Sequence, residues 1–428
     1  MIEYFDKKLN EKYYKLQHKS GLDIYVFPKN MSGSYAVFGT EYGSVDNCFK
    51  LKGESEFTSV PDGIAHYLEH RMFTQKDGSD ITERFSECGA DSNAYTSFNK
   101  TVYLCSSSDN FEQALAALFE FVTEPNFTDE LVERERGIII QEIKMTEDSP
   151  YSRGYKALLE AMYKYNSARV DIAGTVESVS EITADMLNKC YDTFYNPNNM
   201  VAVVCGNITP QKVMEIADAS LPDSFVGKEI ERSYCKNEPD EVSQPLFEDY
   251  MEVSKPIFTI GIKDNAIESD PQRRMRKFTA MGLLCELIFS RSGALYNELF
   301  ESGMITSDFD ASYTSSKTFA YTIISGEADN PQTVLEYIKN HIKNFTFTED
   351  DLKRCKRVLY AEYVMDFDST EEIANNMIDY IFEGFDLFEY GHVIEDVTSD
   401  EIKCLINSEF KDEYFAMSVI YPLETERK

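Results

Sequence analysis

The sequence predicts an α+β fold, with helices packed on a largely antiparallel sheet, built twice along the chain. Strand-like and helical apolar patterns are mixed without strict alternation, which argues against a doubly wound parallel sheet. The pattern of the first half also returns in the second half, at an offset of about 215–220 residues. We therefore expect two related domains.

Apolar periodicity places the elements of the first half. Alternating apolar and polar residues predict strands over 23–27 and 36–41. Apolar residues at helical spacing predict four helices, near residues 62–74, 111–124, 128–146 and 183–194. The last of these leads into a strand-like apolar run at 200–205.

The repeat is visible in paired segments of the two halves. The strand-like run 101–105, the helix start at Phe127-Thr128 and the strand-like run 200–205 have counterparts at 319–324, Phe347-Thr348 and 415–421. Each half is large enough to bury its own core. We expect a first domain over 1–225, an acidic linker over 226–252 and a second domain over 253–428, because the stretch around 236–241 is polar and contains proline.

Composition excludes several classes of protein. The chain of 428 residues is 43% hydrophobic, so it has ample material for folded cores. Its 42 basic and 75 acidic residues give a net charge of −33. Such a surface repels phosphate backbones and anionic membranes, so we expect neither a nucleic-acid nor a membrane partner.

Targeting signals and cysteines indicate a cytoplasmic protein. No uninterrupted apolar run reaches 18 residues, and the first residues lack the basic and apolar regions of a secretory signal. The nine cysteines are scattered and none forms a C-x-x-C pair. We expect reduced thiols, without a disulfide framework or a cysteine-based zinc site.

Two of the five histidines lie one helical turn apart, at His66 and His70, with Glu69 between them. Imidazoles at this spacing can bind one divalent ion, and an adjacent carboxylate can accept the proton of a metal-bound water. Chance predicts only about 0.006 such H-x-x-E-H matches in this composition. The alternative is a solvated helix, which the apolar neighbours of the histidines disfavour.

The predicted helix from Thr128 offers a third ligand. Residues 131, 135, 138, 142 and 145 share one face, which is apolar except for Glu135 and Glu142. Two carboxylates on such a stripe need a positive partner. A zinc ion would supply it, and salt bridges with Arg134 and Arg136 are the alternative.

The segment His66-Tyr67-Leu68-Glu69-His70 resembles the signature of the inverzincin peptidases, also called the insulinase or pitrilysin family. The resemblance extends over essentially the whole chain and is strongest to short bacterial members of about 430 residues. It implies that His66, His70 and Glu142 bind one zinc ion and that Glu69 is the general base. The resemblance also implies that Glu135 is a carboxylate of the catalytic site that supports the zinc ligands.

The resemblance also implies substrate-binding residues. The segment 89–96 is similar to the family's edge strand, where Asn93 and Ala94 would bind the substrate backbone by strand addition. The segment 292–300 is similar to the family's signature in the second half. The arginine and tyrosine that often follow this signature are not in register here, and Tyr313 is a candidate substitute.

The resemblance implies a zinc endopeptidase that cleaves short or unfolded peptides inside a clamshell chamber of four α+β domains. This chain offers half of such a chamber, so we expect a homodimer or a heterodimer with a related subunit. The acidic surface favours basic peptides, and processing of a small peptide precursor is one candidate task. The alternatives are a non-catalytic peptide-binding or structural subunit and a zinc hydrolase of a non-peptide substrate.

Overall fold

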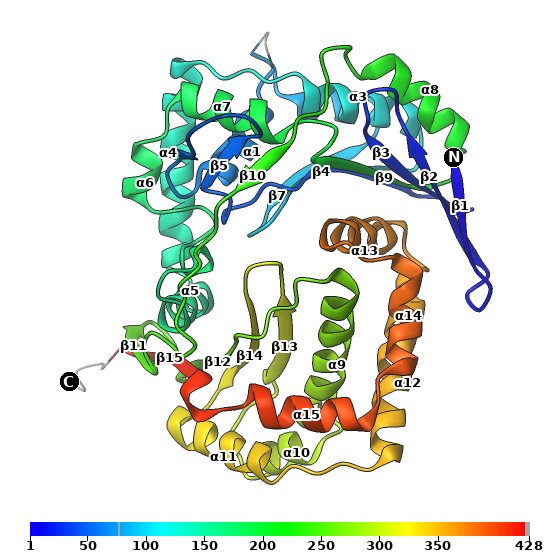
Figure 1. The fold of residues 1–428 in the computed structure, drawn as a ribbon. Coiled ribbons are helices and arrows are strands. Elements are labelled where there is room, and N and C mark those ends of the chain that lie inside the picture. Colours follow the sequence, from blue (N-terminus) through cyan, green and yellow to red (C-terminus); the bar gives the residue numbers. More distant parts are fainter. Residues whose placement is uncertain (76–77, 424–428) are drawn as a thin grey trace. The chain divides into compact units, whose positions relative to one another are not determined.

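The computed structural model describes residues 1–75 and 78–423. The chain forms two compact units (Figure 1). Unit 1 contains residues 1–143, 171–234 and 364–382. Unit 2 contains residues 144–170, 235–363 and those from 383 on. Each unit is therefore assembled from separate stretches of the sequence, whereas the boundaries predicted from the sequence are contiguous.

Unit 1 is built on a seven-stranded sheet of order β1-β2-β3-β9-β4-β8-β7. Neighbouring strands are antiparallel, except that β3 and β9 are parallel. The strands are β1 (Ile2–Asp6), β2 (Glu11–Gln17), β3 (Asp23–Pro28), β4 (Ser34–Thr40), β7 (Asp91–Thr96), β8 (Thr101–Ser107) and β9 (Met200–Gly206). A small second sheet joins β10 (Ile230–Arg232), β5 (Cys48–Leu51) and β6 (Thr58–Ser59). Strand β7 lies at one edge of the large sheet.

Helices cover the sheet of unit 1 because each buries one apolar face. The helices are α1 (Ile64–Met72), α2 (Ile81–Glu87), α3 (Phe111–Thr123), α4 (Asp129–Glu147), α6 (Val176–Ser180), α7 (Ala184–Phe194), α8 (Pro210–Ser220) and α13 (Thr370–Glu383). In α3, for example, Leu115, Leu118 and Phe119 are fully buried. They join a core that includes Ala36 and Phe38 of β4. These packed faces produce the helical spacing that the sequence shows.

Unit 2 repeats the plan of unit 1 with a five-stranded sheet of order β11-β15-β12-β14-β13. The strands are β11 (Leu246–Met251), β12 (Ile257–Asp264), β13 (Asp310–Ser315), β14 (Ala320–Glu327) and β15 (Phe415–Pro422). Among the described strand pairs of this sheet only β11 and β15 are parallel, as β3 and β9 are in the large sheet of unit 1. The order and the strand directions match β3-β9-β4-β8-β7, so the prediction of two related α+β halves is confirmed.

The helices of unit 2 follow in the order that the repeat predicts. They are α5 (Pro150–Met162), α9 (Pro271–Phe289), α10 (Ala294–Glu301), α11 (Pro331–Lys343), α12 (Glu349–Asp366), α14 (Leu387–Asp396) and α15 (Ser399–Glu409), with short 3-10 turns η1 (Ser167–Arg169) and η2 (Asp412–Tyr414). Buried residues of α9, such as Leu284 and Ile288, pack with Ile260 of β12 and Ile324 of β14 in a separate core.

One helix from each half of the sequence is assigned to the other unit. Helix α5 packs on β12 and β15 of unit 2, and α13 belongs to unit 1. A glycine in each central strand makes room for the helix. A Cβ at Gly39 of β4 would lie 2.6 Å from Ile378 Cδ1 of α13, and a Cβ at Gly261 of β12 would lie 2.4 Å from Met162 Sδ of α5. Both helices therefore pack at very close range.

The segment predicted as an acidic linker, 226–252, contains strands β10 and β11. Arg232 on β10 donates to Asp46 Oδ1 of unit 1 over 3.0 Å. The Glu238 carboxylate accepts backbone N–H groups from residues 164–166 of unit 2 and an ammonium hydrogen bond from Lys263. Charged side chains thus fix this polar segment to the folded units.

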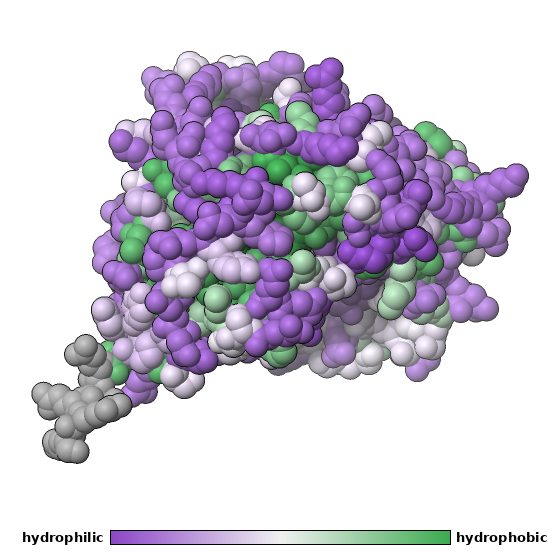
Figure 2. Space-filling view, turned by 90° about the horizontal axis from the view of Figure 1, so that it is seen from below, coloured by the Kyte–Doolittle hydropathy of each residue, from purple (hydrophilic) through white to green (hydrophobic). Residues whose placement is uncertain are grey.

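Hydrophilic residues cover most of the face shown in Figure 2, as the strongly acidic composition leads one to expect. The segment Pro271–Glu301, which carries α9 and α10, is long and apolar enough on average to cross a membrane. Its most apolar window is 56% buried inside the structure. Core helices meet the same criterion, and these two helices contribute to the core of unit 2.

Candidate metal centre

Two glycines fix the start of α1, the helix that carries the histidine motif. Gly63 caps α1 at φ 86°, and a Cβ there would lie 2.4 Å from the carbonyl oxygen of Ala173. Gly174 has φ 78°, and a Cβ there would lie 2.6 Å from the carbonyl oxygen of Asp62. The two backbones can meet this closely only because both residues lack a side chain. The segment 172–175 thereby holds the first turn of α1 in place.

The apolar residues of α1 orient its histidines. Ile64, Leu68 and Met72 are buried in the core of unit 1. His66 and His70 remain partly exposed on another face, with ring centroids 4.6 Å apart. Their one-turn spacing therefore places both imidazoles side by side, as the sequence predicts.

Helix α4 packs on unit 1 through Val132, Ile139 and Ile143, which are buried. The face that carries Glu135 and Glu142 is different from this packed face. On it, Ile138 is 52% exposed and the Glu142 side chain is 43% exposed. The stripe inferred from the sequence thus lies beside the packed face of α4 and is open around Ile138 and Glu142, while Glu135 is only 14% exposed.

The structure brings His66, His70 and Glu142 together. Their ligand atoms all lie within 4.8 Å of one another. Glu142 Oε1 lies 3.5 Å from His66 Nε2, and Glu142 Oε2 lies 3.3 Å from His70 Nε2. Ligands at about 2.0–2.1 Å around a tetrahedral zinc ion are separated by roughly 3.3 Å. Two imidazoles and one carboxylate at this spacing fit a zinc ion that keeps a fourth position open.

Glu135 lies behind the ligands and contacts one of them. Its Oε1 lies 3.2 Å from His70 Nδ1, and its Oε2 accepts a hydrogen bond from Arg71 Nη1 over 3.3 Å. The salt bridges considered from the sequence take another form. Arg136 pairs with Glu133 and donates to the carbonyl oxygens of Val179 and Ile182. The cation that meets Glu135 is Arg71, which the sequence analysis did not single out.

The carboxylates of Glu135 and Glu142 stabilise the protonated form of His70 in the metal-free site. Burial opposes a charge on His70, but hydrogen bonds to Glu135 and Glu142 outweigh it and raise the pKa of His70 to about 10. Hydrogen bonds from His66 and His70 hold the pKa of Glu142 well below its usual range. The His70 hydrogen bond also lowers the pKa of Glu135, against the effect of burial. A cation that binds here would displace a proton from His70.

Glu69 is 7% exposed and lies on α1 beside the histidines. Thr96 Oγ1, on the edge strand β7, donates to Glu69 Oε2 over 2.7 Å. This hydrogen bond fixes one carboxylate oxygen and leaves the other for a proton. Thr96 is a second site residue that the sequence did not identify, although it ends the segment that resembles the family's edge strand.

The predicted substrate-binding residues Asn93 and Ala94 lie on β7. Within the described residues this strand pairs only with β8, so its other edge has no strand partner there. The Ala94 N–H donates to Asn93 Oδ1 over 2.9 Å, outside the ladder with β8. Asn93 also lines a cavity of about 390 Å³ together with Glu69 and His70. Peptide binding by these two residues stays a prediction.

Tyr313, the candidate substitute from the second half, lies on β13 of unit 2. It is 9% exposed, and its hydroxyl donates to Asp264 Oδ2 over 2.7 Å. Burial, with the nearby Asp264 carboxylate, raises the pKa of Tyr313. The hydroxyl is engaged within its own unit, and a role in substrate binding stays a prediction.

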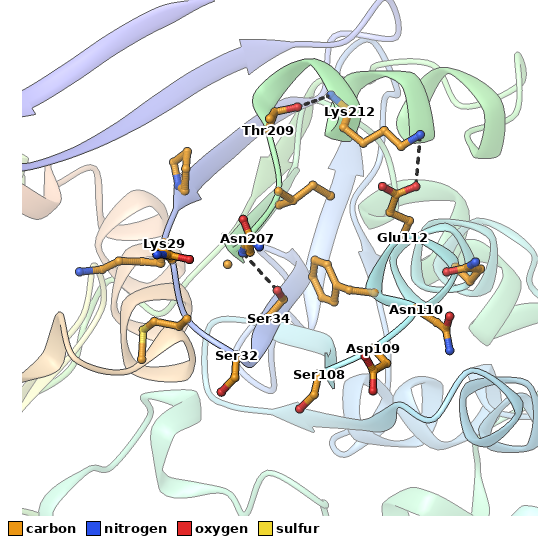
Figure 3. A pocket seen from close by; sticks show the side chains of 17 residues that line it. Lys29, Ser32, Ser34, Ser108, Asp109, Asn110, Glu112, Asn207, Thr209 and Lys212 are labelled. Atoms are coloured by element: carbon orange, nitrogen blue, oxygen red, sulfur yellow. Dashed lines mark hydrogen bonds and ion pairs between the residues drawn. The ribbon is translucent and has the colours of Figure 1, made fainter.

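A second cavity in unit 1, of about 1040 Å³, contains none of the predicted site residues. Loops at the ends of β3, β8 and β9 line it, together with the first turns of α3 and α8 (Figure 3). Its two lysines are already paired, Lys29 with Glu11 and Lys212 with Glu112.

Comparisons with known proteins identify the family of the chain. The family model described as Insulinase (Peptidase family M16) matches residues 58–176, and the model described as Peptidase M16 inactive domain matches residues 181–359. A Bacillus subtilis protein named as the uncharacterized zinc protease YmfH is 36% identical over 428 residues, covering 98% of this chain and 99% of the relative. The chain therefore belongs to the M16, or insulinase, family of peptidases, as the sequence resemblance indicated.

Solved structures extend the match to the whole fold. The crystal structure of a protein described as an M16-like peptidase from Alicyclobacillus acidocaldarius has a TM-score of 0.91 and 31% identity, covering 96% of this chain and 98% of the other. A protease from Helicobacter pylori, with a TM-score of 0.81 and 20% identity, covers 96% of this chain and all of the other chain. The latter shares the fold.

Proposed function

We propose that this chain is a zinc-dependent endopeptidase that hydrolyses short or unfolded peptides. The observation that supports this most directly is the cluster of His66, His70 and Glu142 with Glu69 on the same helix. A zinc ion held by the three ligands would lower the pKa of a bound water to about 7 and polarise the scissile carbonyl group.

Glu69 moves the proton in this reaction. Its Oε1 is the oxygen that Thr96 leaves free, so it accepts the proton of the attacking water. The same atom then returns the proton to the nitrogen of the leaving amine. Thr96 keeps Oε2 in place during both transfers, which limits the reorganisation of the carboxylate.

The substrate binds as an extended peptide along the free edge of β7. An incoming strand would pair with the backbone at Asn93 and Ala94, after the Ala94 N–H exchanges its bond to Asn93 Oδ1 for one to the peptide. The cavity of about 390 Å³ beside His70 accepts a substrate side chain, because Phe73, Leu131 and Ile138 contribute apolar surface to it. The net charge of −33 favours basic peptides.

The chain acts in the cytoplasm, as a homodimer or with a related subunit. All nine cysteines are free, which suits a reducing compartment. The family resemblance implies a chamber of four α+β domains, and this chain supplies two such units. Processing of a small peptide precursor is a task that fits this assembly.

Cleavage of a pool of unstructured peptides, followed by mass spectrometry, tests the proposal. Wild type is compared with Glu69→Gln, which keeps the zinc ligands, and with Glu130→Gln, which alters an exposed carboxylate in the first turn of α4. We expect cleavage by wild type and by Glu130→Gln, and none by Glu69→Gln at equal zinc content. Equal cleavage by all three proteins would contradict the role of Glu69.

The alternative is a non-catalytic peptide-binding or structural subunit. The match of residues 181–359 to a model described as an inactive domain is the observation that favours it. That range lies outside His66, Glu69, His70 and Glu142. Peptide binding without any cleavage by zinc-loaded wild type would support this alternative.

A further inference from the structure

Arg71 follows directly after the second histidine and is one of the most deeply buried charged residues of the chain. Its side chain is 1% exposed and is among the largest fully buried side chains in the structure. Burial of a guanidinium is unfavourable unless an anion and hydrogen-bond acceptors surround it. A buried arginine beside a metal site therefore needs a specific partner.

That partner is Glu135. Arg71 Nη1 donates to Glu135 Oε2 over 3.3 Å and contacts Thr74 Oγ1 at 3.3 Å. Nη2 donates to the carbonyl oxygen of Asn126 over 3.4 Å. Among the residues that the structure describes, the guanidinium thus contacts two neutral oxygen atoms and one carboxylate, which is itself only 14% exposed.

Glu135 transmits this contact to a zinc ligand. Its second oxygen lies 3.2 Å from His70 Nδ1. When the Nδ1–H group donates a hydrogen bond to Glu135, the lone pair of the neutral ring lies on Nε2. This nitrogen lies 3.3 Å from Glu142 Oε2, where a metal ion can bind it. The orientation of the His70 ring therefore depends on a carboxylate that Arg71 holds in place.

The charges of the cluster fit the same interpretation. Glu69, Glu135 and Glu142 supply three negative charges, and Arg71 supplies one positive charge. Two negative charges remain, which is what one divalent cation neutralises. Without Arg71 the three carboxylates would carry one more negative charge than a divalent cation neutralises.

We propose that Arg71 is a positioning residue of the metal centre, which fixes Glu135 and through it the His70 imidazole that binds zinc. The inference rests on the proposed metal centre. It adds a residue that contacts no ligand directly and orients His70 through Glu135. Loss of such a supporting contact typically weakens metal binding by about 10- to 100-fold.

The test is zinc affinity, measured by competition with a chromophoric chelator at fixed pH. The variants are Arg71→Met, Arg71→Lys and Glu135→Gln, with the double variant Arg71→Met/Glu135→Gln. Arg136→Met is the matched control, because it removes a partly buried arginine from α4 that does not pair with Glu135. Thermal melting of each metal-free protein identifies variants that fail to fold.

We expect Arg71→Met to weaken zinc binding by about 10- to 100-fold and Arg71→Lys, which keeps the charge, to weaken it less. In the Glu135→Gln background, Arg71→Met should have no further effect, because the two residues act through one contact. Arg136→Met should bind zinc as wild type does.

Wild-type zinc affinity in a folded Arg71→Met variant would overturn the inference. So would fully additive effects of Arg71→Met and Glu135→Gln, since these would show that Arg71 acts independently of Glu135. Should Arg71→Met not fold, the affinity of Arg71→Lys in the two Glu135 backgrounds decides the question in the same way. Failure of wild type to bind zinc would instead reject the metal centre itself, before any variant is compared.

Discussion

Two helix pairs correspond in the two units: α1 and α4 in unit 1, and α9 and α12 in unit 2. They hold equivalent positions in the order of elements around sheets with the same strand order. In unit 1, carboxylates of α4 face two histidines of α1. In unit 2, Arg354 of α12 lies 3.7 Å from Glu286 of α9, with no histidine in either helix. Burial raises the pKa of Glu286, and the nearby Glu362 adds to this effect.

The difference shows what the scaffold supplies and what the side chains add. With Phe127 and Phe347 aligned, Glu142 corresponds to Glu362, while Glu135 corresponds to the buried Cys355. Unit 2 thus has a counterpart of one of the two carboxylates, but its helix pair lacks the supporting carboxylate and the histidines. With the same alignment, Arg354 corresponds to Arg134 of α4, so both helix pairs carry an arginine at this position.

The largest expected effect separates the two corresponding glutamates. Glu142→Ala removes one of the three proposed zinc ligands and should lower zinc affinity by more than the ~10- to 100-fold expected from losing a supporting residue. Glu362→Ala, at the corresponding and exposed position of α12, should leave zinc affinity unchanged. Chelator competition on both variants measures this, and equal losses would show that the two helix pairs do not differ as described.

The pH dependence of zinc binding tests the charge of the α1–α4 pair. In the metal-free protein the pKa of His70 is raised to about 10, so His70 is protonated at neutral pH and must release one proton when zinc binds. Zinc affinity should therefore rise with pH, by about tenfold per unit and about a hundredfold from pH 6 to pH 8. Glu142, whose pKa is lowered, is already ionised in this range. A flat profile in the competition assay would contradict the protonated state of His70.

A smaller effect on peptide cleavage is expected from the edge strands, β7 of unit 1 and β13 of unit 2. Thr96→Val on β7 removes the hydrogen bond to Glu69, a contact to a charged group worth ~1.5–3 kcal/mol, and should lower kcat by about tenfold or more. Zinc affinity should stay unchanged, and Thr96→Ser should restore kcat. Thr314→Val on β13 is the matched control in unit 2. Peptide-cleavage kinetics decide this, and a wild-type kcat for Thr96→Val would show that Glu69 needs no such support.

The smallest effect is expected at Arg354. Its side chain is 39% exposed, so its ion pair with Glu286 should stabilise the protein by less than about 1 kcal/mol. Arg354→Met should lower the free energy of unfolding by no more than this and leave zinc affinity unchanged. Chemical denaturation measures the first and chelator competition the second. A loss of several kcal/mol would contradict this, because it would show that the ion pair contributes more than a partly exposed pair does.

Much of the fold and of the site was predictable because it depends on local spacing. The one-turn spacing of His66 and His70 requires only a helix, and the two related halves follow from repeated apolar patterns. Arg71 was not predictable, because an arginine in the last turn of a helix usually points to solvent and only tertiary packing shows its burial. The open face around Ile138 was misjudged for a similar reason, since spacing alone does not tell which of two apolar stripes packs.

The exchange of α5 and α13 makes the two halves of the gene product interdependent. A fragment that ends at residue 225 would contain α5 without the sheet of unit 2 that it covers. It would also lack α13, and the narrow gap over Gly39 would open to water. The duplicated halves are therefore no longer separable modules, and a break in the chain between them would damage the metal-binding half as well as its counterpart.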